Sequence, residues 1–193
     1  MKDIETKKNL IIHYETQQAQ RLACKVIFKP PLTVWYILIP VIFVYYFFRL
    51  NKYSSSRKAF VEHFMRSRKR AIEAATISVV RDRPPGIDDM IAQTRIPSEA
   101  VAAFKSYAKV LVEHYADLLN ASGGDHDTLL KAAYRTRSNY LLFLNRLGQV
   151  EKALDQALAP SLATDHPTVG DTIALIERQI AQLRRDEADR IFG

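Results

Sequence analysis

The sequence has little cysteine, glycine or tryptophan. Its 193 residues include one cysteine, six glycines and one tryptophan. A single cysteine excludes a disulfide framework within the chain and any zinc site built from several cysteines. With only eight prolines and an apolar fraction of 48%, the chain is also unlike disordered or low-complexity proteins. We therefore expect it to fold as one domain or two small ones.

Motifs that carry chemistry are also missing. No glycine-rich phosphate loop, G-x-S-x-G elbow, HExxH pair or Glu-x-x-His pair occurs. Glu62–His63 and Glu113–His114 are adjacent pairs, and adjacent side chains diverge on a helix, so we expect these histidines at helix surfaces or boundaries. Asp125–His126–Asp127 follows two glycines, so Asp125 or Asp127 is expected to cap a helix. The sequence thus favours a protein without catalytic, metal or cofactor sites, although an enzyme built from scattered residues stays open.

One long uncharged run stands out against this background. Residues 30–48 read PPLTVWYILIPVIFVYYFF. A helix of that length spans about 28 Å, close to the roughly 30 Å of a bilayer's hydrocarbon core. Aromatic and basic residues lie near both ends of the run, as in membrane-spanning helices. The expected membrane-interface residues are Trp35, Tyr36, Tyr45, Tyr46, Arg49 and Lys52.

A single span is the first interpretation of this run, and two others stay open. Pro40 lies at its middle and removes a backbone donor, which permits a re-entrant or interfacial segment. A buried core helix could be equally apolar, although the flanking cations Lys29 and Arg49 disfavour it.

The net charge of +7 is unevenly distributed along the chain. Residues 1–29 carry +3, residues 49–83 carry +7 and residues 84–193 carry −3. Three cations lie within 20 residues before the run and six within 20 residues after it. The positive-inside rule then predicts an external N-terminus and a cytoplasmic C-terminal domain, in a cell membrane that we take to be a bacterial inner membrane.

The basic block after the run has a membrane-surface interpretation. We expect contacts to anionic lipid from Arg66, Arg68, Lys69 and Arg70. A role in topology alone is the alternative. Nucleic-acid binding is disfavoured because no reader motif or interleaved aromatic residues accompany the cations.

Helical periodicity predicts the remaining elements. An irregular apolar stripe suggests a helix within residues 3–28. Val61, Met65, Arg68, Ile72, Ala75 and Val79 indicate a helix over 54–80. Further helices are expected over 87–94, 98–121 and 168–190, with Ser98 as the N-cap of the second. Residues 126–159 are expected to form one long helix, or two helices joined at Gly148. Pro160 marks the end of this helical region. No segment alternates with period two. The predicted fold class is all-α: a membrane-inserted helix followed by a three- to four-helix bundle.

Residues 147–160, LGQVEKALDQALAP, resemble the second helix of a tetratricopeptide repeat. The resemblance covers 14 residues, and no second copy lies 34 residues away on either side. A bundle helix is the simpler interpretation.

Together these features predict four parts: an N-terminal tail (1–29), a transmembrane helix (30–48), a basic juxtamembrane helix (49–83) and a bundle (84–193). We expect a non-catalytic, single-pass membrane scaffold or adaptor that presents a docking domain to protein partners. The alternatives are an accessory or regulatory subunit of a membrane enzyme or transporter and a small enzyme acting on lipid at the interface.

Overall fold

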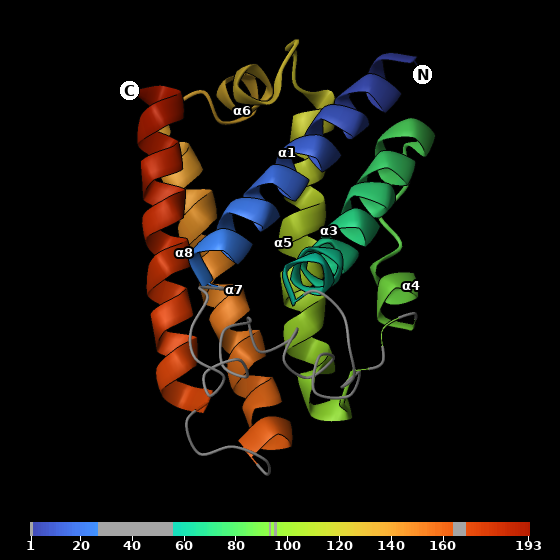
Figure 1. The fold of residues 1–193 in the computed structure, drawn as a ribbon. Helices are drawn as coiled ribbons and strands as arrows, with labels where there is room; N and C mark the ends of the chain where they lie inside the picture. The colour runs from blue at the N-terminus through green and yellow to red at the C-terminus, as the bar shows by residue number, and fades with distance from the viewer. Residues whose placement is uncertain (1, 27–55, 93, 95, 164–168) are drawn as a thin grey trace.

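The computed structural model describes residues 2–26, 56–92, 94, 96–163 and 169–193 (Figure 1). These residues are all helical or irregular and contain no strand, so the all-α prediction is confirmed. The seven α-helices are α1 (Lys2–Val26), α3 (Ser56–Arg81), α4 (Ile87–Ala92), α5 (Val101–Asn120), α6 (His126–Tyr134), α7 (Arg137–Ala163) and α8 (Val169–Phe192), and a 3₁₀ turn, η1, covers Ser98–Ala100.

Helix α5 is the centre of the bundle and packs against α1, α3 and α7. Apolar residues recur along it every three or four positions and face the core: Phe104, Ala108, Leu111, Tyr115 and Leu118 are at most 1% exposed, and Val101 at its start is half-buried. Burying one such large apolar side chain contributes about 1.5–3 kcal/mol relative to leaving it in water. The spacing of this stripe therefore accounts for both the helix and its central position.

Helices α1 and α3 lie together on one side of α5, with α1 crossing in front of α5 in Figure 1. Ile11, Leu22, Met65 and Ile72 bury their side chains in the same core as α5. The boundary predicted at residue 84 does not separate two cores, because α1 and α3 share one with the helices that follow. Helices α7 and α8 lie side by side at the opposite edge of the bundle, and α6 crosses its upper end (Figure 1).

The helical region after residue 126 is interrupted at Arg135 and Thr136, between α6 and α7, and not at Gly148. Arg135 has φ 63° and ψ −39°, which ends α6. Thr136 then accepts a hydrogen bond from the Asn139 backbone N–H at 3.2 Å, as an N-cap does. Helix α7 runs through Gly148 and continues past Pro160 to Ala163. The prediction of one helix, or of a joint at Gly148, was wrong because no glycine or proline marks the true break.

The two predicted N-caps have different outcomes. Asp125 caps α6 in a reciprocal capping box with Thr128, which confirms that prediction. Ser98 lies inside η1 and makes no side-chain cap bond there, so its predicted role was wrong. The 3₁₀ turn that precedes α5 moves the start of the α-helix to Val101.

None of the helices in the described ranges is long and apolar enough to cross a bilayer. The predicted membrane segment, residues 30–48, lies outside these ranges, as do its expected interface residues. That segment therefore stays a prediction from sequence.

Replacing Gly148 with alanine should stabilise the protein. No atom lies within 4 Å of the Cβ that alanine would add, and glycine inside a helix costs about 1 kcal/mol relative to alanine. We expect the free energy of unfolding to rise by about 1 kcal/mol and the Tm by about 2–4 °C, measured by urea and thermal denaturation followed by circular dichroism. A fall in stability would show that the position is crowded.

Candidate functional site

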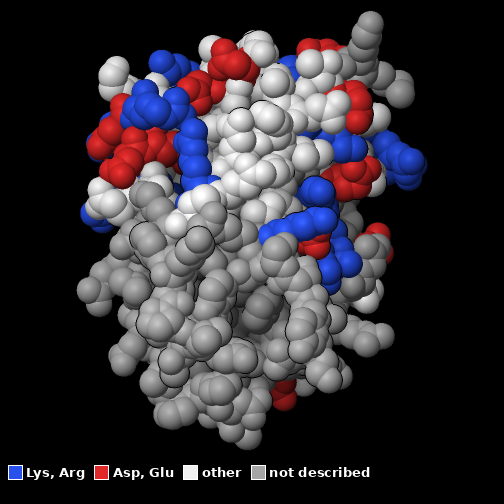
Figure 2. All heavy atoms as spheres, viewed as in Figure 1, with Lys and Arg blue, Asp and Glu red and all other residues white. Residues whose placement is uncertain are grey.

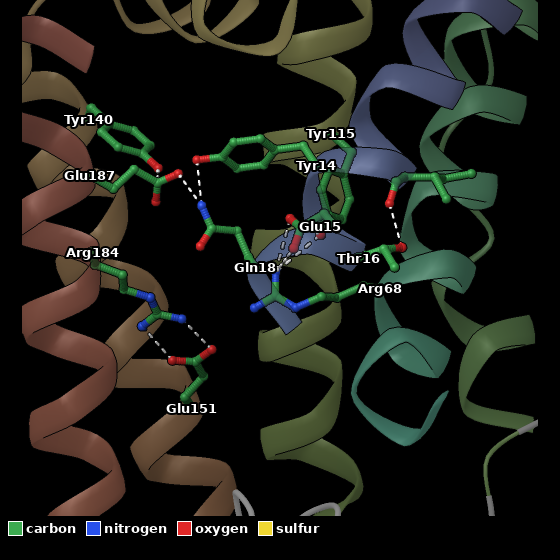
Figure 3. A network of polar contacts seen from close by, with 11 residues as sticks. Tyr14, Glu15, Thr16, Gln18, Arg68, Tyr115, Tyr140, Glu151, Arg184 and Glu187 are labelled. Carbon is green, nitrogen blue, oxygen red and sulfur yellow. Dashed lines mark hydrogen bonds and ion pairs between the residues drawn. The ribbon is translucent and has the colours of Figure 1, made fainter. Parts of the chain in front are cut away.

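A buried cluster of Glu15, Arg68 and Tyr115 joins α1, α3 and α5. Nη1 of Arg68 donates to both carboxylate oxygens of Glu15 at 3.1 Å and to the Tyr115 hydroxyl oxygen at 3.2 Å. The Tyr115 hydroxyl donates to Oε1 of Glu15 at 2.7 Å. The side chains of Arg68 and Glu15 are only 9% and 10% exposed, so the ion pair is largely removed from water. Figure 3 shows the three side chains converging between their helices.

The surroundings of Arg68 keep its guanidinium protonated. Burial is the largest single influence and would lower the pKa of Arg68. The Glu15 carboxylate, together with Tyr115, Tyr107 and Glu151, outweighs burial, so the pKa lies well above its usual value. The guanidinium also lies over the Phe64 ring, 4.6 Å from its centroid. Nε of Arg68 is buried and has no hydrogen-bond partner among the described residues. The Arg68 cation is thus paired with one carboxylate, that of Glu15, and its Nε–H makes no hydrogen bond to the described residues.

A second polar group links α1 to α7 and α8. Gln18 Nε2 donates to the Tyr14 hydroxyl oxygen at 2.7 Å and to Oε1 of Glu187 at 3.2 Å. The Tyr140 hydroxyl donates to Oε2 of the same carboxyl group at 3.3 Å. Burial raises the pKa of Glu187 to about 7, and the nearby Arg190 opposes this only in part. Glu187 is therefore partly protonated at neutral pH.

Helices α7 and α8 are joined by a bidentate ion pair. Nη1 and Nη2 of Arg184 donate to the two carboxylate oxygens of Glu151, each at 2.7 Å. The side chains are 16% and 25% exposed. This fork geometry fixes orientation as well as charge, because both donors and both acceptors are matched.

These three groups line a cavity of about 530 Å³ between α1, α3, α5, α7 and α8. Apolar side chains form much of the remaining wall, among them Leu22, Phe64, Leu144, Leu147 and Leu154. Gly148 also lines the cavity. The volume lies within the range of small-molecule and anchor-residue pockets.

Two histidines border the same cavity as neutral rings. Nδ1 of His114 lies 2.7 Å from the Tyr134 hydroxyl, and the His114 ring stacks on Phe143 with centroids 4.2 Å apart. Burial lowers the pKa of His114 well below its usual value and lowers that of His126 to about 4. The prediction that His114 lies at a helix surface or boundary was wrong, because its apolar neighbours enclose it. His126 stacks on the Tyr14 ring at 3.4 Å.

The arrangement is better suited to binding than to metal chemistry. Across the described ranges, no group of three or more histidine, cysteine, aspartate or glutamate side chains could hold a metal ion. Glu15 and Glu151 are each engaged by an arginine. Glu187 has a pKa of about 7, and it accepts hydrogen bonds from Gln18 and Tyr140.

The residues predicted to contact anionic lipid have separate locations. Arg66 and Lys69 are exposed on α3. Arg70 is half-buried, and its Nη1 donates to the Thr94 hydroxyl at 2.7 Å. Arg68 lies in the buried cluster, because it occupies the apolar face of α3 rather than the basic one. Trp35, Tyr36, Tyr45, Tyr46, Arg49 and Lys52 lie outside the described residues.

The sequence analysis did not identify the residues that build the cavity. Glu15, Gln18, Glu151, Arg184 and Glu187 come from three helices and form no local motif. One signal was available: Arg68 stands inside an apolar stripe, and a charged residue there needs a buried partner.

Comparison of the chain with protein-family models, curated proteins and solved structures finds no match.

Replacing Glu15 with glutamine should strongly destabilise the fold. The substitution leaves the Arg68 charge buried without a counter-charge, and breaking a buried ion pair in this way costs about 3–5 kcal/mol. Urea denaturation measures this loss. The control is Glu73→Gln, which removes the partner of Lys8 in an ion pair between α1 and α3 whose Glu73 side chain is 54% exposed, and this loss should be about 0–1 kcal/mol. Equal losses would contradict the structural role of the buried cluster.

The Glu187→Gln variant should change how stability depends on pH. The pKa of Glu187 is 4.5 in the unfolded chain and about 7 in the fold, so the folded protein binds the proton more tightly. Its contribution to stability is therefore full below pH 4.5 and is lost as the pH rises through 7. The variant does not titrate, and above pH 7 it should gain about 3 kcal/mol relative to the wild type. Denaturation curves from pH 4 to 9 test this, and parallel profiles would contradict it.

Proposed function

We propose that the protein is a non-catalytic, membrane-anchored helical adaptor whose partner docks at the cavity between α1, α7 and α8. The observation that carries the proposal is the pairing of charges inside this cavity. Arg68 is neutralised by Glu15 and Arg184 by Glu151, within the protein itself. Such pairs hold helices in register and leave the apolar wall to recognise a ligand.

The state of the other polar groups also favours binding over catalysis. A general acid or base needs a pKa near the working pH and a free position beside the reacting atom. The rings of His114 and His126 are neutral and stacked on aromatic neighbours. Both carboxylate oxygens of Glu151 accept bonds from Arg184. These groups are engaged in maintaining the cavity.

The cavity wall is suited to large apolar side chains of a partner. Binding energy at protein interfaces is concentrated in a few anchors that fill desolvated pockets. Leu144, Leu147 and Leu154 present one face of α7, and Leu22 and Phe64 face them from α1 and α3. An amphipathic partner segment that inserts two or three apolar side chains would match this surface, since helix-in-groove recognition uses such anchors.

Membrane attachment is the second part of the proposal and comes from residues 30–48. Their length, lack of charge and aromatic ends support insertion into a bilayer. A cytoplasmic location for the helical domain, in a bacterial inner membrane, fits the excess of basic residues around the run.

A lipid-directed enzyme is a second candidate, and Glu187 favours it. This carboxyl group lies in the cavity wall with a pKa of about 7 and a tyrosine hydroxyl 3.3 Å away, as a proton-transferring group requires. Activity toward lipid that is lost in the Glu187→Gln variant would identify this function.

Filling the cavity should abolish partner capture. Gly148 lines the cavity and has open space around its Cβ position, so Gly148→Phe places a ring there without displacing backbone. The tagged full-length protein is purified from detergent-solubilised membranes, and proteins retained in stoichiometric amounts are identified by mass spectrometry. We expect the wild type to retain such a partner and Gly148→Phe to lose it.

The matched control is Ala153→Phe, which adds the same ring on an exposed position of α7 that does not line the cavity. It should retain the partner. Retention by both variants would place the docking surface elsewhere. Failure of the wild type to retain any protein would contradict the adaptor function. A partner that is itself an integral membrane enzyme or transporter would identify the protein as an accessory subunit.

A further inference from the structure

The helices on either side of the uncharged run are neighbours in one folded domain. Helix α1 ends at Val26 and α3 begins at Ser56, so 29 residues separate them along the chain. In Figure 1 the end of α1 and the start of α3 both lie near the middle height of the bundle. Val26 and Ser56, the described residues on either side of the uncharged run, therefore belong to the same domain.

Several contacts fix α1 against α3. The buried pair of Glu15 and Arg68 joins their middles. Nearer the start of α1, Lys8 Nζ lies 2.7 Å from Oε2 of Glu73 on α3. Ile11 and Ile72 are completely buried in the same core. Two helices with such contacts must occupy the same aqueous compartment.

A single span is incompatible with this packing. It would place α1 and α3 on opposite sides of a hydrocarbon layer about 30 Å thick. The ion pair between Glu15 and Arg68 would then be broken, and the apolar stripe of α1 would face water. The packing of the described helices thus excludes the single span and leaves the re-entrant or interfacial segment and the buried core helix.

We propose that the protein is attached to the membrane from one side only: the chain enters and leaves the bilayer through the same face at residues 30–48, and α1 and the helices from α3 onward share one compartment. This inference depends on the membrane attachment in the proposed function, but not on the docking cavity. It replaces the expectation of an external N-terminus.

The charge pattern agrees with this topology. Both flanks of the run are basic, with three cations in the 20 residues before it and six in the 20 residues after it. A single span needs one flank to be translocated, whereas a one-sided attachment keeps all nine cations on the side that favours them. Pro40 at the middle of the run suits a change of direction, and half of the run as a helix reaches about 14 Å, roughly one leaflet.

The domain also offers cations to the headgroups of that face. Arg21 near the end of α1 and Lys58, Arg66 and Lys69 in the first half of α3 are exposed. Figure 2 shows Lys and Arg side chains gathered in the part of the view where Figure 1 places α3. Anionic lipid is the expected partner, since each cation near such a surface makes the binding free energy more favourable by a similar amount. Arg68 takes no part in this contact, because its charge is used inside the fold.

Cysteine labelling of the full-length protein tests the topology. The native Cys24 is the chain's single cysteine and is exposed on α1. In a Cys24→Ser background, Asn9→Cys reports on α1 and Ser122→Cys reports on the loop after α5, since both positions are exposed. Right-side-out and inside-out vesicles are treated with a membrane-impermeant maleimide. We expect both reporters to react in inside-out vesicles and neither to react in right-side-out vesicles.

Three outcomes separate the inference from the function. Reaction of the two reporters from opposite sides overturns the one-sided topology and removes the α1 wall of the docking cavity, while the membrane anchoring of the proposed function stands. Release of the protein by alkaline carbonate overturns membrane insertion, and with it the anchoring part of the proposed function. Reaction from the same side in carbonate-resistant membranes supports the inference, whether or not a partner is captured at the cavity. Cys24→Ser alone is the labelling control and should not react.

Discussion

The ion pair between Glu15 and Arg68 is the interaction on which the rest of the structure depends. It joins the first helix to the second described one, and through Tyr115 it connects both to the central helix. A buried charge pair is a weak source of net stability, since desolvation offsets much of the attraction. Its value here is orientation, because it aligns the middle of α1 with α3 and, through Tyr115, with α5. The position of α1 in turn determines one wall of the cavity and places Val26 and Ser56, on either side of residues 27–55, in one domain.

The apolar periodicity of the sequence was sufficient to predict most helices. The stripes of α3 and α5 were found because apolar residues recur at helical spacing, and most of these side chains are buried. The interruption at Arg135 was not predicted, because a positive φ at an arginine cannot be recognised from the residue type. Gly148 was considered as a possible joint, although α7 is continuous through it. Propensity alone does not locate a break that tertiary contacts of the two helices determine.

The cavity could not be predicted in the same way. Its polar residues are far apart in the chain, and pairs such as Arg184 and Glu151 are recognisable only when α7 and α8 are side by side. Arg68 is instructive, because it was counted both as a member of the apolar stripe of α3 and as a lipid-facing cation. A guanidinium cannot serve both roles, and burial decided the matter. The exposed cations Arg66 and Lys69 kept the surface position that the sequence suggested.

The long reach of the central cluster has a consequence for how the protein is made. Tyr115 is 100 residues downstream of Glu15. At about 5–20 residues per second, Glu15 therefore waits roughly 5–20 s after its synthesis before Tyr115 exists. During that interval the apolar stripe of α1 and Glu15 have no core to enter, while the most hydrophobic run of the chain follows immediately behind. The order of synthesis thus leaves the apolar face of α1 uncovered until the helices that bury it have been made.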